Sequence, residues 1–337
     1  ATLLTIGLHR PTVVQAQELE PTPTLQAVVV SGVLPGPGLW KVSRDGRSLW
    51  IIGSLTPVPK RMEWESLQVE RTLTRSGQVL MMPGLKVDAD VGFFGGLMLL
   101  PTALSARKIP DDKRLQDVLP PALYERWLTL KARYLGSNRS VERWRPMFAA
   151  QELYDAAIRK SGLSDDNPVV PLLRKRAKKH GVPMQSPRLE VKLTEPKAAL
   201  KAFAKSPLDD TACFEKTLDR LETDLANMRA RANAWAVGDI DGLRQLPFED
   251  HGRTCLQALL DSQLAAEYEL VDVPQRVGDL WLKSAEDALR DHETSLAVLP
   301  ISQLLKPDGY LARLQARGYE VEAPASLAPE SSATAPD

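Results

Sequence analysis

Short apolar runs with the features of buried strands lie near both ends of this chain, and a long, mostly helical pattern separates them. Residues 39–42 and 48–52 flank Arg44-Asp45-Gly46, a turn sequence that predicts a β-hairpin. Residues 78–82 and 295–299 are bounded by glycine, proline or charge, as buried strands usually are. This order predicts an α/β fold, with a central mixed sheet flanked by helices and a large helical insertion.

Two helices are predicted early in the insertion from their apolar periodicity and their end signals. The first covers residues 120–135, with proline in its first turn and Gly136 as its stop. The second covers residues 141–161 and stops at Gly162. Both are amphipathic, so each is expected to pack one face against the rest of the protein.

The longest predicted helix covers residues 209–237, with Gly238 as its stop. Its apolar positions alternate by four and three residues, which makes a narrow seam suited to packing along another helix. One interpretation is a homodimer, in which two copies form a coiled coil. The other, which we favour, is a hairpin with residues 249–264 of the same chain, which would bring Cys255 towards Cys213.

Charge and hydropathy exclude two classes of partner. Lys+Arg and Asp+Glu both number 43, so the chain lacks the excess of positive charge that a nucleic-acid binder uses. The basic run at 174–180 has helical spacing and predicts a solvated helix face. The most apolar stretch, 91–106, is shorter than the ~20 residues that span a bilayer. Because glycines and Pro101 interrupt it, we expect a buried core helix or a kinked helix rather than a transmembrane segment.

The N-terminal residues predict export. Residues 1–8 are apolar, and Val14-Gln15-Ala16 places small residues where signal peptidase requires them. We therefore interpret 1–16 as part of a signal peptide and 17–37 as a proline-rich linker, followed by a domain at 38–324. A loose apolar tail is the alternative for the first segment, and residues 325–337 have the composition of a disordered tail.

Export would place the protein in the periplasm or outside the cell, where disulfides persist. The chain has two cysteines, Cys213 and Cys255, and we expect them to pair in such a compartment. No familiar catalytic motif accompanies them. The sequence lacks a G-x-S-x-G elbow, a phosphate-binding P-loop and a G-x-G-x-x-G turn, and its four histidines show no metal-ligand spacing.

Four segments nevertheless resemble a known family. These are LWKV at 39–42, WIIGSLT at 50–56, AWAVGDIDGL at 234–243 and KPDGYLARLQARGYEVE at 306–322. They are similar to the TraB/GumN family, which is related to the Tiki proteases and the erythromycin-esterase-like proteins. The resemblance runs over about 39–322, nearly all of the predicted domain, and implies an α/β core and a metal-dependent hydrolase.

The same resemblance shows that the expected metal ligands are missing. The family has a G-x-x-H after its first strand and another near its C-terminus, and here Thr56 and Gln303 stand at the two histidine positions. A family glutamate matches Met82 or Pro83, and a second matches Arg188. Arg276 matches the arginine of a family Arg-Asn pair.

Threonine hydroxyl, thioether and amide groups are poor ligands for a divalent metal, and a guanidinium repels it. We therefore predict a pseudoenzyme with no catalytic residue, no metal and no cofactor. Its vestigial cleft would hold a small polar or anionic ligand, a peptide or an envelope protein, and its predicted residues are Gly53, Thr56, Arg188, Arg276 and Gln303.

Two other interpretations remain open from the residues alone. In one, the side chains of the former metal site only satisfy one another and bind nothing. In the other, the protein is a metal-dependent hydrolase whose ligands come from elsewhere in the chain, for instance Asp88, Asp90 or His251.

Overall fold

The computed structural model describes residues 36–89, 91–206, 208–246, 251–268 and 270–324. The chain divides into two units, 1–32 and 33–337, and all the described residues belong to the second. The predicted signal peptide, nearly all of the predicted linker and the predicted C-terminal tail lie outside the described residues.

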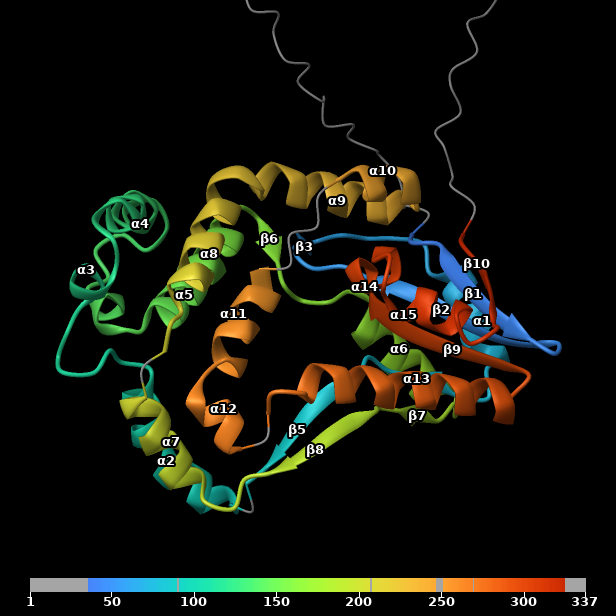
Figure 1. Cartoon of the computed structure of the whole chain (residues 1–337). Helices are drawn as coiled ribbons and strands as arrows, with labels where there is room; N and C mark the ends of the chain where they lie inside the picture. Colours follow the sequence, from blue (N-terminus) through green and yellow to red (C-terminus); the bar gives the residue numbers. More distant parts are fainter. Residues whose placement is uncertain (1–35, 90, 207, 247–250, 269, 325–337) are drawn as a thin grey trace, which may run out of the picture. The chain divides into compact units, whose positions relative to one another are not determined.

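A six-stranded mixed sheet forms the centre of the fold, as predicted (Figure 1). Strands β2, β9, β4 and β7 run parallel to one another, whereas β1 is antiparallel to β2 and β10 is antiparallel to β1. In spatial order the strands are β10 (Glu320–Glu322), β1 (Leu39–Arg44), β2 (Arg47–Ser54), β9 (Thr294–Pro300), β4 (Val79–Leu80) and β7 (Met184–Gln185).

The predicted hairpin is confirmed by β1 and β2. Arg44 pairs with Arg47, so Asp45 and Gly46 form a two-residue turn. Both turn residues have positive φ, 53° and 77°, which suits a tight turn between twisted strands. The runs predicted at 78–82 and 295–299 also form strands, although β4 is only two residues long.

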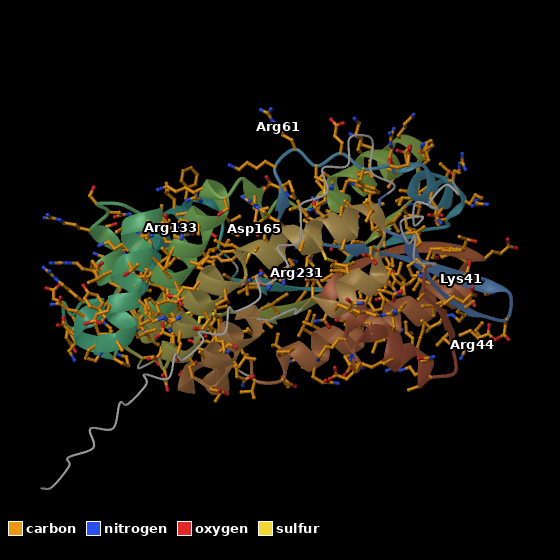
Figure 2. All side chains as sticks on the ribbon, turned by 90° about the horizontal axis from the view of Figure 1, so that it is seen from above. Lys41, Arg44, Arg61, Arg133, Asp165 and Arg231 are labelled. Carbon is orange, nitrogen blue, oxygen red and sulfur yellow. A yellow bond between two sulfur atoms is a disulfide. The ribbon has the colours of Figure 1, made fainter. Side chains whose placement is uncertain are left out.

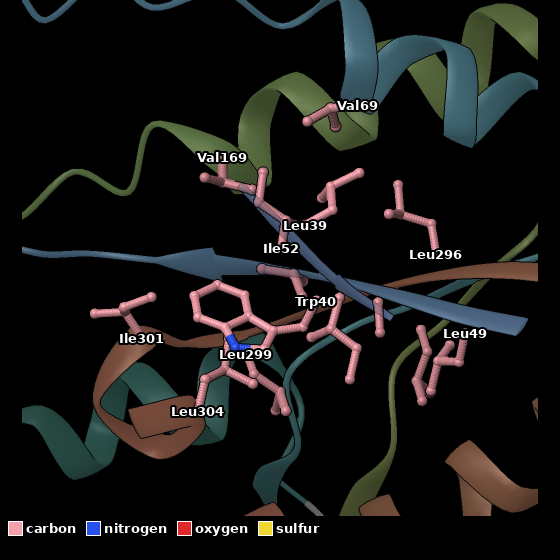
Figure 3. Packing of buried hydrophobic residues seen from close by; sticks show 14 of the residues in the cluster. Leu39, Trp40, Leu49, Ile52, Val69, Val169, Leu296, Leu299, Ile301 and Leu304 are labelled. Atoms are coloured by element: carbon pink, nitrogen blue, oxygen red, sulfur yellow. The ribbon is translucent and has the colours of Figure 1, made fainter. Parts of the chain in front are cut away.

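Helices cover the sheet and enclose a core that includes Trp40, Ile52, Trp235, Trp281 and Leu299. Figure 3 shows Trp40 of the hairpin beside Leu299 and Leu304, whereas Ile52 lies on the other side of the strands, towards Val169. The helices that contribute buried residues to this core are α1 (Leu67–Arg75), α6 (Val169–His180), α9 (Leu225–Val237), α10 (Ile240–Gln245), α13 (Val273–Asp291), α14 (Ile301–Leu305) and α15 (Tyr310–Gln315).

The predicted helical insertion has a core of its own, in which the rings of Trp127 and Phe214 lie 5.4 Å apart. Further helices are α2 (Phe93–Ala106), α3 (Leu115–Val118), α4 (Pro121–Tyr134), η1 (Ser140–Arg143), α5 (Pro146–Lys160), α7 (Pro196–Lys205), α8 (Thr211–Thr223), α11 (His251–Leu260) and α12 (Gln263–Glu267). The prediction at 120–135 is confirmed by α4. The single helix predicted at 141–161 was wrong, because Pro146 requires an extended Arg145 and so separates η1 from α5.

The helix predicted at 209–237 is also two helices, α8 and α9, which meet at Asp224. The buried carboxylate of Asp224 accepts two hydrogen bonds from the buried guanidinium of Arg231, at 2.9 and 2.5 Å. Figure 2 shows Arg231 among the side chains of the fold. This ion pair, rather than a glycine or proline, accompanies the break, so the helical periodicity alone gave no warning of it.

The apolar seam of α8 and α9 packs inside the chain. Its first half joins the core of the insertion, and its second half, including Trp235, joins the core of the sheet. Helix α11 packs on α8, and Cys213 and Cys255 form the predicted disulfide, with their Cα atoms 4.6 Å apart. The hairpin interpretation is therefore confirmed for the part that the structure describes.

Two short ribbons extend the fold. Strands β3 (Val58–Pro59) and β6 (Leu163–Ser164) pair antiparallel, and β5 (Gly84–Asp88) and β8 (Arg188–Lys192) pair parallel. The second ribbon continues β4 and β7, because Met81 N–H donates to Gln185 and Gly84 N–H donates to Pro187.

Two other predicted helices, α6 and α2, both leave many of their side chains exposed to solvent. The basic run at 174–180 lies on α6 with most of its charged side chains in solvent, as predicted. Of the two alternatives predicted for 91–106, the buried core helix was wrong, because α2 leaves Phe94 and Met98 about four-fifths exposed. No helix in the described ranges is both long and apolar enough to cross a bilayer.

Candidate functional site

Four parallel strands end at one edge of the sheet, the position at which open α/β sheets bind ligands. A cavity of about 760 Å³ lies at this edge, beyond the ends of β4 and β9. Its wall combines the segments after these two strands with α11, α13 and α15. The lining residues are Met82, Pro83, Leu256, Gln257, Leu260, Pro274, Gln275, Gly278, Pro300, Gln303, Lys306, Asp308, Gly309, Tyr310 and Arg313.

Three amide side chains line this cavity, which we call the edge cavity. Gln257 donates to Asp261 at 2.7 Å, and Gln275 donates to Asp279 at 3.2 Å. Gln303, on α14, is half-buried and has no hydrogen-bond partner among the described residues. Its amide is therefore available to donate to and accept from a ligand.

The charged groups of the edge cavity are paired. The Nζ of Lys306 lies 3.0 Å from a carboxylate oxygen of Asp308, and Arg313 donates to Asp279. Burial raises the pKa of the Tyr310 hydroxyl above its ordinary value, so this group is a neutral donor at neutral pH. The cavity therefore offers amide and hydroxyl groups rather than uncompensated charge.

Two buried indoles close the edge of the sheet from within. The Nε1 of Trp235, on α9, donates to the carbonyl of Gly53 at 2.7 Å. The Nε1 of Trp281, on α13, donates to the carbonyl of Met81 at 3.2 Å. These bonds give each carbonyl, at the ends of β2 and β4, a buried indole donor. Both tryptophans are fully buried.

Close packing around position 53 leaves no room for a side chain larger than that of glycine. A Cβ at this position would lie 2.4 Å from Cδ1 of Ile301 and 3.3 Å from Leu304 and Trp40. Glycine therefore lets α14 approach the end of β2 closely, and α14 carries Gln303 into the edge cavity. The next residue, Ser54, is polar, and its hydroxyl donates to the carbonyl of Leu299 at 3.3 Å.

Replacing Gly53 with alanine should lower the free energy of unfolding by about 1–3 kcal/mol, because the added methyl group overpacks the core. Urea unfolding of both proteins measures this loss. Gly84→Ala is the matched control, because no atom lies within 4 Å of its Cβ position. An equal loss in the two variants would contradict the packing role of Gly53.

The structure places the residues of the predicted cleft in different surroundings. Gln303 lines the edge cavity, together with Met82 and Pro83, the two residues that the resemblance offers as matches to a family glutamate. Thr56 is exposed in the segment after β2 and is absent from the cavity lining. Arg188 is exposed at the start of β8, and Arg276 is exposed on α13, 3.4 Å from Asp272.

Both arginines therefore lie outside the lining of the edge cavity. Arg188 is displaced because β8 belongs to the ribbon that extends past the sheet, not to the sheet itself. Arg276 points its charge to Asp272 on its own helix, whereas its neighbour Gln275 lines the cavity. The edge cavity therefore lacks the two arginines from which an anion-attracting cleft was predicted. The arginine in its lining is Arg313, which is paired with Asp279.

The donor set at this edge does not fit the metal that the family resemblance implies. At the positions that the resemblance assigns to metal ligands stand Thr56, Met82 or Pro83, and Gln303, and none of these side chains supplies an anionic or imidazole donor. Across the described ranges, the histidine, cysteine and acidic side chains form no group of three or more that could hold a metal ion. No step of a metal-dependent reaction can be derived from these residues.

The sequence reasoning missed Trp281 and Tyr310, whose rings lie 4.8 Å apart beside the edge cavity. Tyr310 lies within the segment 306–322 that carried the family resemblance, so its position was a usable signal. Trp281 had no such signal, because a buried tryptophan on an amphipathic helix usually belongs to the core.

Comparison with known families gives one match. The sequence model described as TraB/PrgY/gumN family matches residues 38–323. No curated protein and no solved structure matches this chain.

Proposed function

Because this chain belongs to the TraB/PrgY/gumN family, we propose that it is a non-catalytic member that binds a small polar ligand in the edge cavity. The observation that carries this proposal is a contrast at one edge of the sheet. At the positions that the resemblance assigns to the family's ligands stand Thr56, Met82 or Pro83, and Gln303, yet an open cavity lined by the unpaired amide of Gln303 lies at the same edge.

The chemistry of the lining favours a neutral ligand that bears amide groups, such as a short peptide. The amide of Gln303 can pair with a peptide group in both directions, and Tyr310 offers a neutral hydroxyl. Met82, Leu256 and Leu260 supply apolar surface for a side chain. A simple anion is disfavoured, since Lys306 and Arg313 already have carboxylate partners.

The proposal includes export, because the disulfide between Cys213 and Cys255 suits an oxidising compartment such as the periplasm. In that setting the ligand would be a molecule of the cell envelope or of the medium. An envelope protein that presents an extended segment is an equivalent ligand, since its peptide groups have the same chemistry.

Isothermal titration calorimetry with short peptides, dicarboxylates and inorganic phosphate tests the proposal. We expect binding of peptides only, and Gln303→Leu should weaken it by about tenfold because a peptide group then lacks its partner. Gln315→Leu is the matched control, an exposed glutamine on α15 outside the cavity lining. Absence of heat with every compound, or equal binding by the two variants, would reject the edge cavity as a peptide site.

The alternative is a metal-dependent hydrolase with ligands recruited from elsewhere. Asp88, one of the residues considered for that role, is exposed on β5, and Asp90 lies outside the described residues. Elemental analysis of the purified full chain separates the two functions. Stoichiometric zinc, manganese or cobalt would overturn the non-catalytic proposal.

A further inference from the structure

Helix α2 is built with its large apolar side chains outward. Phe94 is 78% exposed and Met98 is 80% exposed, and Leu97 and Leu100 are at least half exposed. The opposite face carries smaller or partly buried residues: Gly95, Leu99, Thr102 and Ala103 are partly buried, and Ala106 is buried. A helix that packed by its apolar face would show the reverse arrangement.

This exposed face has no charged rim of its own. Residues 91–106 contain no Asp, Glu, Lys or Arg, so the whole length of α2 is uncharged. Both cores of the fold are filled by other elements, and of α2 only Ala106 reaches full burial among its described side chains. A contiguous apolar surface of this kind usually marks an interaction site.

The helix beside α2 supplies the missing charge. Helices α2 and α7 lie side by side (Figure 1) and are in contact. Helix α7 contains no acidic residue, and its three lysines, Lys197, Lys201 and Lys205, recur every four residues along one face. All three are exposed, and none has an ion-pair partner within the described ranges.

From this juxtaposition we propose that α2 and α7 form a docking surface for an anionic lipid bilayer. Helix α2 has 14 residues, a length of about 21 Å, which is too short to span a hydrocarbon core of about 30 Å. It lies in the plane of the interface, with Phe94, Leu97 and Met98 among the acyl chains. The lysines of α7 face the negatively charged headgroups, an arrangement that strengthens interfacial binding.

A second copy of the chain is a poorer occupant of this surface. Two copies related by a two-fold axis would meet through the same patch, so the unpaired lysines of both α7 helices would come together. Like charges brought together in an interface oppose association. An anionic bilayer removes this repulsion and covers the apolar face at the same time.

Co-sedimentation of the full chain with vesicles tests the proposal, using phosphatidylcholine alone and phosphatidylcholine mixed with phosphatidylglycerol. We expect binding to the mixed vesicles, weakened on the order of 100-fold by the double variant Phe94→Ser, Met98→Ser. Val271→Ser, an exposed apolar position outside α2 and α7, is the matched control and should bind as the wild type does.

Replacing the three lysines of α7 with glutamine should remove the preference for phosphatidylglycerol, a loss of about tenfold or more. Circular dichroism establishes that each variant is folded. Equal sedimentation of the wild type and the double variant, or no sedimentation with either vesicle, overturns the proposal. A concentration-dependent dimer that the double variant abolishes, without vesicle binding, assigns the surface to a second copy instead and also overturns it.

Discussion

Asp224→Ala should lower the free energy of unfolding by about 3–5 kcal/mol, because it leaves a buried guanidinium without its carboxylate. Arg231 is 4% exposed and donates two hydrogen bonds to Asp224, and Arg220 lies 3.7 Å from the same carboxylate. Chemical unfolding followed by circular dichroism measures the loss.

Asp241→Ala is the matched control for this experiment. Its carboxylate pairs with Arg244 at 3.0 Å, but both side chains are more than half exposed, so the expected cost is below about 1 kcal/mol. A double-mutant cycle with Arg231→Ala separates the pair from other effects of each substitution. A loss below about 1 kcal/mol for Asp224→Ala would show that the buried pair does not stabilise the fold.

The ion pair at Asp224 also bears on the candidate site. It joins Arg231 of α9 to Asp224 at the junction of α8 and α9, and α9 carries Trp235 to the carbonyl of Gly53. A loosened junction should therefore disturb the packing of Gly53 against α14. We expect Asp224→Ala to weaken peptide binding through this route, even though Asp224 lies outside the edge cavity.

Removal of the disulfide should cost about 4 kcal/mol, because the bridge closes a loop between residues 42 apart in sequence. The bridge joins α8 to α11, and α11 supplies Leu256 and Gln257 to the edge cavity. Unfolding of the double variant Cys213→Ala, Cys255→Ala, compared with the wild type, measures the cost.

The wild type treated with reductant serves as a second measurement of the same cost, without any change of sequence. Unchanged stability in both experiments would show that the other contacts between α8 and α11 hold the two helices together without the bridge. Mass spectrometry without reductant should find Cys213 and Cys255 bridged in the protein as it is produced by the cell. Free thiols there would contradict the proposed oxidising compartment.

Much of the fold could be predicted from local pattern. The turn at Asp45 and Gly46 needs residues that tolerate positive φ, and the sequence supplies them between two strands. The stops at Gly136 and Gly238 follow from the same property, since both glycines adopt the left-handed conformation that ends a helix. These signals act between near neighbours, so the sequence displays them directly.

The candidate site could be predicted only in part, because its members come from distant segments. Gln303 was found through its place in a motif that follows a strand. Arg188 was expected beside it, but its position depends on the pairing of β5 with β8 beyond the sheet. Non-local pairing of this kind leaves no mark in the local pattern of residues.

The sequence by itself determined the family, the alternation of strands and helices, and the helix ends at Gly136 and Gly238. Tertiary structure alone decided that the long helix breaks at Asp224, that α2 turns its large side chains outward, and that Met82 and Gln303 share a cavity without Arg188. For α2 and for the cavity the physical reason is the same, because exposure and convergence are set by neighbours far apart in sequence, as Ser54 and Leu299 are, 245 residues from one another. Asp224 and Arg231 are only seven residues apart, but the tertiary packing decides that both are buried.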